Sequence, residues 1–402
     1  MDEAFLPYGR HLIEDDDVAQ VERALRSGAL TGGPAVAAFE RALAETTAAT
    51  CAVACSSGTA ALHLAALALD LKPGDAAVVP SLTFLATANA LRYVGADVVF
   101  ADVDPDTGLL TPAGLEAALA RADKDKRARV RAVFPVHLAG QCADMAAIGR
   151  VARGRGLKVV EDACHALGGT CGGKAVGACA ESDLAVFSFH PVKTIAMGEG
   201  GAITTRDPAL ARRLMELRSH GMVRDPARFE IRAQGFGADG EPNPWYYEMP
   251  EPGFNYRASD IHCALGLSQL AKLGRFVAER RRIMEWYEDE LAPLSRLVKP
   301  LPRVPWSEPA WHLNVVLIDF RAAGTTRARV MRALAAEGIG SQVHYLPVHR
   351  QPYYRRLYGE MHLPGADAYY ERTLSLPLYV GLARADVARV VAALARALGL
   401  KP

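Results

Sequence analysis

The sequence predicts an α/β protein whose larger part is built on a mostly parallel β-sheet. Between about residues 50 and 205, short apolar runs typical of buried strands alternate with stretches of helical periodicity. Buried strands that alternate with helices are characteristic of parallel sheets that are covered on both faces. A second series of elements follows from about residue 259. We therefore expect a large domain, residues 1–258, and a smaller C-terminal α/β domain with its linking helix, residues 259–402.

The expected strands of the large sheet are short runs rich in alanine and valine. They are residues 52–54, 76–79, 96–100, 132–134, 158–161 and 184–187. Helical patterns lie between them, for example over residues 59–69 and 112–121. Each strand is thus followed by enough chain to cross back over the sheet, as parallel pairing requires.

The alternation of strand and helix patterns is interrupted at residues 224–254. Residues 233–244 are rich in glycine and proline, and the aromatic cluster Trp245, Tyr246 and Tyr247 follows. A loop of this length in a compact chain is usually functional or mobile. A long helical pattern over residues 259–291 then leads into the C-terminal domain. There we expect a strand at 311–318, a helix at 327–337, a strand at 340–345 and a final helix at 385–398.

Composition gives no reason to expect a nucleic acid or a membrane as partner. The 402 residues carry 46 basic and 45 acidic side chains, a net charge of +1. No apolar stretch is long enough to span a bilayer. Residues 1–4 are acidic and lack the basic start of a secretory signal peptide.

The seven cysteines predict neither a disulfide framework nor a metal site. They are Cys51, Cys55, Cys142, Cys164, Cys171, Cys179 and Cys263. Their number is odd, their spacing is irregular and no C-x-x-C pair occurs. We expect reduced thiols in a cytoplasmic protein without a bound metal.

A candidate phosphate site lies at Ser57, Gly58 and Thr59. A strand ends in small hydroxyl residues here, and a helix begins at once. Free backbone N–H groups at a helix start, with the helix dipole behind them, suit a phosphate. An ordinary serine or threonine N-cap explains the same residues. This motif alone leaves both interpretations open.

A carboxylate is expected at the end of a central strand. Asp162 follows the apolar run 157–160, and burial of its charge is costly unless it meets a cation. A protonated pyridine nitrogen is such a cation, and keeping that nitrogen protonated makes pyridoxal phosphate an effective electron sink. The alternative is an aspartate that caps the next segment.

Lys193 follows the expected strand 184–187. Ser188 lies before it and the glycine-rich turn 198–201 lies after it. An amine beside an anion-binding hydroxyl at a strand end is suited to bind a phosphorylated aldehyde cofactor covalently, as an imine. Desolvation or a nearby cation makes a lysine nucleophilic by lowering its pKa. A lone lysine is more often a solvated surface charge, but Asp162 lies about one helix–strand unit earlier.

Together these motifs resemble the DegT/StrS family of sugar aminotransferases that depend on pyridoxal phosphate. The resemblance extends from about Tyr8 into the C-terminal domain and implies the aspartate-aminotransferase fold, type I. The matching stretches are residues 30–34, 57–62, 80–89, 135–141, 161–168, 188–201 and 254–261. The chain departs from the common family pattern at Ala139, Cys142 and Cys164, none of which is expected to be catalytic.

The resemblance implies a role for each matching residue around the cofactor. Lys193 would form the imine and later move the proton between the two carbon centres, and Asp162 would pair with the pyridine nitrogen. His165 would lie near the phenolic oxygen, and Phe84 would stack on the ring. The phosphate would be held by Ser57, Gly58, Thr59 and Ser188, and by Asn255 of a neighbouring subunit. The active sites would then be shared within a homodimer.

Within the family, residues 218–222, 245–248 and 342–349 are most similar to the pseudaminic acid branch. That branch aminates C4 of a UDP-linked 4-keto-6-deoxy-N-acetyl-hexosamine to give UDP-4-amino-4,6-dideoxy-N-acetyl-β-L-altrosamine, with L-glutamate as the expected donor. The implied sugar-nucleotide contacts are Tyr8, Ala29, Leu30, Thr31, Ser57, Asn255, His344 and Tyr345. A core tyrosine at position 8 and a strand-end histidine at position 344 are the alternatives.

Three other functions compete with this one. The first is an aminotransferase that acts at C3, or on another nucleotide keto-sugar. The second is a sugar dehydratase on the same scaffold, but in the resembling dehydratases a histidine replaces the lysine found here at Lys193. The third is a non-catalytic regulator, which loss of Lys193 or Asp162 would have favoured.

Overall fold

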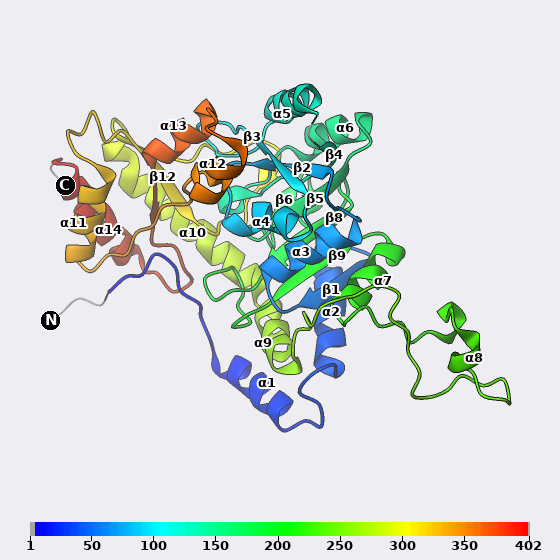
Figure 1. Ribbon diagram of the computed structural model, residues 1–402. Coiled ribbons are helices and arrows are strands. Elements are labelled where there is room, and N and C mark those ends of the chain that lie inside the picture. Colours follow the sequence, from blue (N-terminus) through cyan, green and yellow to red (C-terminus); the bar gives the residue numbers. More distant parts are fainter. Residues whose placement is uncertain (1–4, 127, 401–402) are drawn as a thin grey trace.

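A seven-stranded sheet forms the centre of the larger part of the molecule, in the order β1-β9-β8-β5-β4-β2-β3 (Figure 1). The computed structural model describes residues 5–126 and 128–400, so the signal-peptide expectation at residues 1–4 lies outside the described part. The strands are β1 (Cys51–Cys55), β2 (Asp75–Pro80), β3 (Asp97–Ala101), β4 (Arg129–Val133), β5 (Lys158–Asp162), β8 (Leu184–Ser188) and β9 (Gly201–Thr205). All six expected strands are present.

The sheet is mostly parallel, as predicted. Strands β8, β5, β4, β2 and β3 pair in parallel, and β9 pairs antiparallel with both β1 and β8. The sequence pattern did not predict β9. Since β9 is antiparallel to two strands, β1 and β8 point the same way. The carboxyl ends of β1, β2, β4, β5 and β8 therefore meet at one edge of the sheet.

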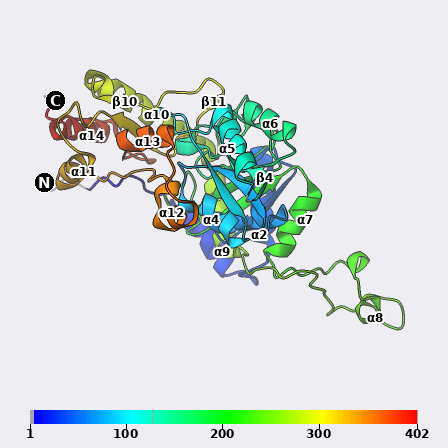
Figure 2. The same ribbon diagram turned by 45° about the horizontal axis from the view of Figure 1, so that its top comes forward.

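Helices cover both faces of this sheet (Figures 1 and 2). They are α2 (Pro34–Thr47), α3 (Gly58–Ala68), α4 (Leu85–Tyr93), α5 (Pro112–Asp125), α6 (Met145–Gly154) and α7 (Pro208–Leu217). Successive residues of β8 enter different cores, because side chains alternate between the faces of a strand. Leu184 and Val186 belong to the core that contains α3 and α7, whereas Phe187 packs with Phe39 and Leu43 of α2.

A second, antiparallel sheet forms the C-terminal part, with the order β10-β12-β13. Its elements are β10 (Val298–Pro300), β12 (Asn314–Ile318), β13 (Thr373–Leu376), α10 (Leu273–Leu291), α11 (Arg327–Ala336) and α14 (Arg384–Ala397). Its core contains Ile283 and Tyr287 of α10, Val316 and Val390, together with Leu6 from the N-terminal segment. A third, small sheet consists of β6 (Thr170–Cys171), β7 (Lys174–Ala175) and β11 (Ser307–Glu308). The boundary at residue 258 stays a prediction.

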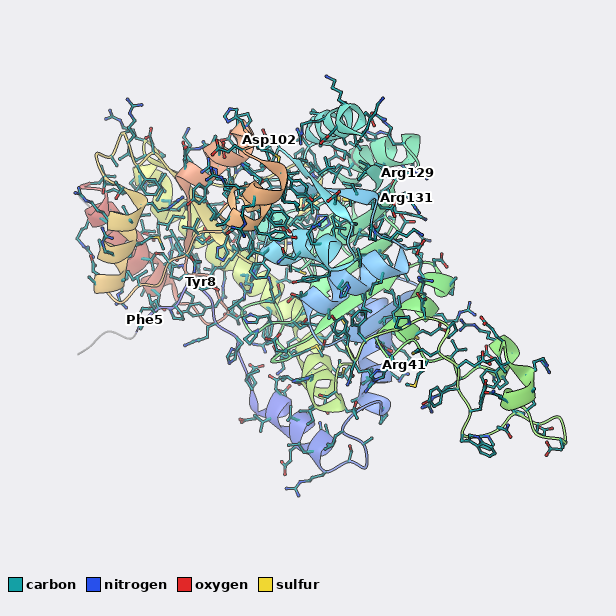
Figure 3. The ribbon with its side chains drawn as sticks, in the orientation of Figure 1. Phe5, Tyr8, Arg41, Asp102, Arg129 and Arg131 are labelled. Atoms are coloured by element: carbon teal, nitrogen blue, oxygen red, sulfur yellow. The ribbon has the colours of Figure 1, made fainter. Side chains whose placement is uncertain are left out.

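Asp102 joins the two parts. It follows β3, and its carboxylate accepts hydrogen bonds from the backbone N–H groups of Gly365 (2.9 Å) and Ala366 (2.8 Å). These groups lie in the first turn of α13 (Pro364–Arg372), where a carboxylate is favourable. Figure 3 labels Asp102 at this junction and Tyr8 on the N-terminal segment, which runs beside the C-terminal part. Within the described residues, no helix is both long and apolar enough to span a bilayer.

The expected strand at residues 340–345 is wrong. Only one bridge forms there, between Gln342 and Ser375, and the rest of the segment is irregular. The polar side chains of this stretch explain the difference, because His344 directs its ring to the Ser375 hydroxyl (2.7 Å) instead of extending a ladder. The strand expected from residue 311 begins only at Asn314, since the N–H of His312 bonds the carbonyl of Ala139 (2.9 Å).

Residues 224–254 form an arm that extends away from the body (Figures 1 and 2) and carries α8 (Arg232–Gly235). The rings of Phe229 and Tyr246 meet edge to face, with centroids 4.9 Å apart. The carboxylate of Glu248 accepts the N–H groups of Glu230 and Ile231 at 2.7 and 2.8 Å. The arm therefore has its own small set of contacts.

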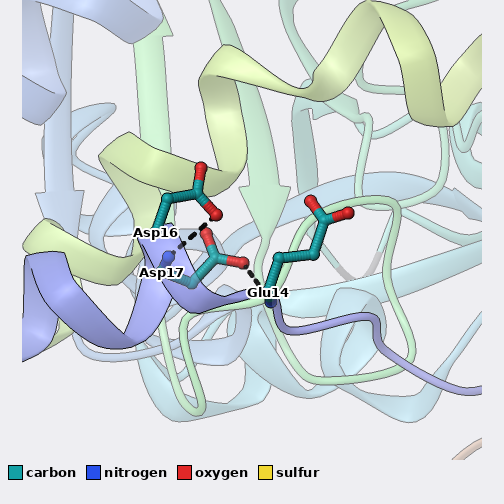
Figure 4. A group of neighbouring side chains, drawn as sticks. All are labelled: Glu14, Asp16 and Asp17. Carbon is teal, nitrogen blue, oxygen red and sulfur yellow. Dashed lines mark hydrogen bonds between the residues drawn. The ribbon is translucent and has the colours of Figure 1, made fainter.

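The helical pattern over residues 259–291 is interrupted at Lys272, which separates α9 (Asp260–Ala271) from α10. The Lys272 ammonium lies 3.1 Å from Glu14, 2.6 Å from Asp16 and 2.8 Å from Asp17. These three carboxylates lie at the start of α1 (Asp15–Leu25), and Figure 4 shows them gathered there. Lys272 thus anchors the N-terminal helix to the junction of α9 and α10.

Asp17 is fully buried, and the N–H group of the Gln269 side chain also bonds its carboxylate (2.8 Å). Burial alone raises the pKa of Asp17, but hydrogen bonds from Lys272 and its other neighbours outweigh burial and leave the pKa below its usual value. A carboxyl with a lowered pKa in the folded state stabilises the protein above its unfolded-state pKa. That contribution is lost as pH falls through the folded-state pKa.

We expect Asp17→Asn to lower the free energy of unfolding at neutral pH by about 3 kcal/mol, because it removes one partner of a buried ion pair. The difference from the wild type should shrink as pH falls below 3.8, the ordinary pKa of an aspartate. Thermal melts over a pH series measure both effects.

The control is Asp16→Asn, which removes a carboxylate that is equally close to Lys272 but is 63% exposed. Its cost should stay below about 1 kcal/mol. Equal losses in the two variants, or a loss from Asp17→Asn that does not change with pH, would contradict the importance of the buried charge.

Candidate active site

A cavity of about 540 Å³ opens where the parallel strands end. Segments that follow β1, β2, β4, β5 and β8 line one side of it, and Tyr8 and residues 342–345 line the other. Ligands of open α/β sheets bind at this edge. The cavity brings together the predicted residues Tyr8, Ser57, Gly58, Thr59, Phe84, Asp162, His165, Ser188, Lys193, His344 and Tyr345.

At one end of the cavity, the start of α3 lies against the ends of β8 and β9. A Cβ atom on Gly58 would lie 2.7 Å from the Cβ of Ser188, and one on Gly201 would lie 2.2 Å from the carbonyl oxygen of Ser57. Only glycine permits this approach. It leaves the first N–H groups of the helix, which have no intrahelical acceptor, next to the Ser188 side chain.

Ser57 is the N-cap of α3, because its hydroxyl oxygen accepts the N–H of Ala60 (3.1 Å). The N-cap interpretation of this residue is therefore correct. It is compatible with an anion site, since the hydroxyl hydrogen of a capping serine is still a donor.

Asp162 ends β5 in the middle of the sheet and is 5% exposed. Its carboxylate accepts the hydroxyl of Thr87 (2.6 Å) and the N–H of Cys164 (3.2 Å). The Thr87 hydroxyl in turn lies 2.7 Å from that of Thr83. Across residues 5–126 and 128–400, Asp162 forms no ion pair. A buried carboxylate that lines a cavity without a cation of its own suits a cationic ligand group.

Lys193 lies in the loop between β8 and β9 and lines the same cavity. Burial lowers the pKa of its ammonium, and the nearby Cys164 and Asp162 oppose the shift without cancelling it. The neutral, nucleophilic amine is therefore more accessible than in a solvated lysine. The loop is fixed at Ala196, whose N–H bonds the side-chain oxygen of Gln269 (3.3 Å).

Three aromatic side chains border the cavity beside Asp162. The Tyr345 hydroxyl lies 3.1 Å from Nε2 of His165, and the rings of His165 and His312 lie 4.4 Å apart. Burial holds the pKa of both histidines well below the usual range, with further lowering from Lys193. Both rings are therefore neutral at physiological pH. Nδ1 of His165 is buried and has no partner among the described residues.

His344 is also buried and neutral, since burial lowers its pKa to about 3, helped by the charge of Lys193. Its ring lies 5.5 Å from that of Tyr8. Phe84 is 55% exposed and stands at the start of α4, with its ring 6.0 Å from that of Tyr345.

Four predicted residues lie outside this cavity: Ala29, Leu30, Thr31 and Asn255. Leu30 and Thr31 are exposed, and they lie beside the start of α9, where Leu30 accepts the N–H of Asp260 (3.0 Å). Asn255 is exposed and bridges to Ser219. Within a single chain, the structure does not bring these residues to Lys193.

Thr87 and His312 are site residues that the sequence analysis did not select. Thr87 lies in the matching stretch 80–89, four residues after Thr83. Thr83 precedes helix α4 and Thr87 lies in its first turn, where the two hydroxyls meet. That spacing was a usable signal. His312 reaches the cavity through a contact with Ala139 far away in sequence, and no local pattern marks it.

Comparisons with known proteins identify the family. The model of the DegT/DnrJ/EryC1/StrS aminotransferase family matches residues 11–395. The spore coat polysaccharide biosynthesis protein SpsC of Bacillus subtilis is 40% identical over 392 residues, which are 97% of this chain and 96% of that protein.

Solved structures show the same fold. PseC of Helicobacter pylori, described as an aminotransferase involved in the biosynthesis of pseudoaminic acid, matches with a TM-score of 0.86 and 26% identity over 98% of this chain and 99% of its own. The putative sugar aminotransferase Spr1654 of Streptococcus pneumoniae, in its PLP form, matches with a TM-score of 0.85 and 26% identity over the same shares. The fold is that of the type I enzymes that depend on pyridoxal phosphate, and the chain belongs to the DegT/DnrJ/EryC1/StrS aminotransferase family.

Proposed function

We propose that this aminotransferase moves an amino group from L-glutamate to C4 of a UDP-linked 4-keto-6-deoxy-N-acetyl-hexosamine, giving UDP-4-amino-4,6-dideoxy-N-acetyl-β-L-altrosamine. The observation that carries the proposal is that Lys193, Asp162 and the helix start at Gly58 line one cavity. A reactive amine, an unpaired buried carboxylate and an anion site then lie together, as a phosphorylated pyridine aldehyde requires.

The residues present fit pyridoxal phosphate. Gly58 lacks the Cβ that would fill the space against Ser188. The carboxylate of Asp162 has no cationic partner within the described part of the chain and suits a protonated ring nitrogen. When bound, the cofactor supplies an electron-withdrawing ring. Ser57, Gly58, Thr59 and Ser188 would hold the phosphate, Phe84 would cover the ring, and His165 would lie near the phenolic oxygen.

Lys193 acts in this proposal as the covalent attachment point and as the base that moves the proton. A base has to be neutral before it accepts a proton, and the lowered pKa of Lys193 favours that state. Thr87 orients the Asp162 carboxylate through its 2.6 Å hydrogen bond. The neutral rings of His165 and His312 add no positive charge that would compete for Asp162.

The sugar-nucleotide assignment rests on the far wall of the cavity and on two relatives. Tyr8, His344 and Tyr345 line the cavity opposite the strand ends, where a second ligand would meet the cofactor. The two relatives that act in polysaccharide and pseudoaminic acid biosynthesis favour a keto-sugar of surface polymers as substrate. The free state of all seven cysteines agrees with a cytoplasmic location for this step.

The active protein in this proposal is a homodimer with shared sites. Asn255 would reach the phosphate in the partner subunit, and Ala29, Leu30 and Thr31 would contact the sugar nucleotide there. All four lie outside the cavity of their own chain. The arm at residues 224–254 leads to Asn255 and exposes Trp245 (75%), which favours a contact with a second copy.

Lys193→Ala should abolish amino transfer, with a loss of about a thousandfold or more, while the fold is retained. Turnover with glutamate and a keto-sugar nucleotide measures the loss, and circular dichroism checks the fold. Lys299→Ala, at an exposed position on β10, is the control and should keep wild-type turnover.

The same amine is tested directly by borohydride reduction of the wild-type protein followed by peptide mapping. The cofactor should be fixed to Lys193. An adduct on another residue, or full turnover by Lys193→Ala, would refute this role.

Thr87→Val should weaken binding of pyridoxal phosphate by about tenfold to a hundredfold, because it removes a hydrogen bond to a charged group. A titration of the cofactor-free protein followed by absorbance measures the dissociation constant. Thr83→Val removes a hydroxyl that contacts Thr87 and not Asp162, so its effect should be below about tenfold. Unchanged affinity in Thr87→Val would show that the Asp162 contact does not depend on this hydroxyl.

The substrate is tested by offering a panel of keto-sugar nucleotides with L-glutamate and locating the new amine by NMR. We expect amination at C4 of the UDP-linked N-acetyl sugar. Products aminated at C3, or formed only from another nucleotide sugar, would overturn this part of the proposal and leave the assignment of Lys193 intact.

A further inference from the structure

A pair of cysteines, Cys142 and Cys171, lies on the other side of β5, away from the active site. Cys142 follows the short helix η1 (Leu138–Gly140), and Cys171 lies in β6. Cys142 is buried, whereas Cys171 is half-buried and lines a small surface cavity of about 130 Å³. None of the residues that line this cavity lines the active site.

Each of the two cysteine sulfur atoms lies against the backbone beside the other cysteine. Sγ of Cys142 is 3.7 Å from the carbonyl oxygen of Thr170, the residue before Cys171. Reciprocally, Sγ of Cys171 is 3.7 Å from the carbonyl oxygen of Ala143, the residue after Cys142. The thiols also interact with each other. Each side chain therefore points at the backbone of the other.

Strand β11 and the adjoining Trp306 hold the backbone at Cys142 next to the backbone at Cys171. The N–H of Cys142 donates to the Ser307 hydroxyl (3.0 Å), and the indole N–H of Trp306 donates to the carbonyl of Cys142 (2.9 Å). Ser307 is also the register partner of Cys171 in the β11–β6 pair. Two segments that are distant in sequence are thus held to the same short strand, with each thiol turned towards the other segment.

The two thiols differ in reactivity. The hydrogen bond from the Cys142 thiol lowers the pKa of Cys171, so Cys171 is the thiol that ionises and also the one that is accessible. The same contact and burial raise the pKa of Cys142. An accessible, low-pKa cysteine beside a second, protected one is the arrangement of an attacking and a resolving thiol.

We propose that Cys142 and Cys171 form a redox-sensitive dithiol that closes to a disulfide by exchange with a small-molecule disulfide such as oxidised glutathione. The Cys171 thiolate attacks one sulfur of the small disulfide and releases one glutathione thiolate. Cys142 then loses its proton to the solvent and attacks the Cys171 sulfur, which releases the second glutathione thiolate. Two protein thiols are oxidised and one small disulfide is reduced to two thiols.

Cys179 lines the same surface cavity and is the competing partner. Its sulfur contacts the carbonyl oxygens of Gly177 (3.5 Å) and Thr204 (3.3 Å). Neither Gly177 nor Thr204 adjoins Cys142 or Cys171 in sequence. The sulfur of Cys179 is therefore not directed at the backbone of either cysteine.

The full-length holoenzyme should be incubated with oxidised glutathione, and its free thiols counted and its unreduced peptides mapped by mass spectrometry. We expect a loss of two of the seven thiols, one cross-linked peptide pair that joins Cys142 to Cys171, and full recovery with dithiothreitol. Oxidation should also raise the melting temperature, because the bond constrains the unfolded chain.

Cys142→Ser separates the two steps, since Cys171 should then keep one glutathione as a stable mixed disulfide. Cys51→Ser, a half-buried cysteine of β1, is the matched control and should still form the bond between Cys142 and Cys171. The proposal is overturned if wild-type Cys171 stays free, keeps a glutathione adduct or pairs with Cys179. The wild-type map decides this even if the serine variant does not fold.

Discussion

The charge of Asp162 is the constraint around which the active site is organised. A carboxylate at the end of a central strand is surrounded by protein on both faces of the sheet, and an uncompensated charge there costs several kcal/mol. The chain gives it a hydroxyl from Thr87 and a backbone N–H from Cys164, but no cation within ion-pairing distance among the described residues. The remaining compensation has to come from a ligand, and the cavity that holds Lys193 opens directly onto this group.

The buried histidines that line the cavity do not supply the positive charge that Asp162 lacks. Three buried histidines, His165, His312 and His344, border the cavity, and burial keeps each of them neutral. Had they been charged, they would have repelled a protonated ring nitrogen in the cavity. Because their pKa values are low, the Asp162 carboxylate stays available to a cationic ligand group.

The large sheet was predictable because its strands are short apolar runs with glycines and hydroxyl residues at their ends. The strand β9 was not expected, because Ile203 is the only large apolar residue among its five, the others being glycine, alanine and threonines. The long helix was predicted as continuous because its leucine spacing runs on through Lys272, although Gly274 lies two residues later. The break coincides with three carboxylates that come from α1. The information missing for β9 lies in its pairing with distant strands, whereas Gly274 was a local signal near the helix break.

Some residues of the active site also had a local signal in the sequence, whereas others did not. Lys193, Asp162 and the Gly58 turn were predictable because each lies at or shortly after the end of a strand, and parallel strands bring their carboxyl ends together. Thr87 had a local signal in its spacing from Thr83, whereas His312 depends on a hydrogen bond to a turn far away in sequence. The predicted strand at 340–345 failed because alternating polar and apolar residues also describe a segment that lines a cavity.

The buried side chain of Gln269 has a wider consequence than its size suggests. Its oxygen accepts the N–H of Ala196 in the lysine loop, and its nitrogen donates to the carbonyl of Leu12 (3.0 Å) and to Asp17 (2.8 Å). One amide group thus connects the loop under the active site to the segment that carries Tyr8. Detachment of the N-terminal helix from Lys272 would also remove a support of the lysine loop. The first helix of the chain and the floor of the active site are therefore expected to open together, as one cooperative unit in hydrogen exchange.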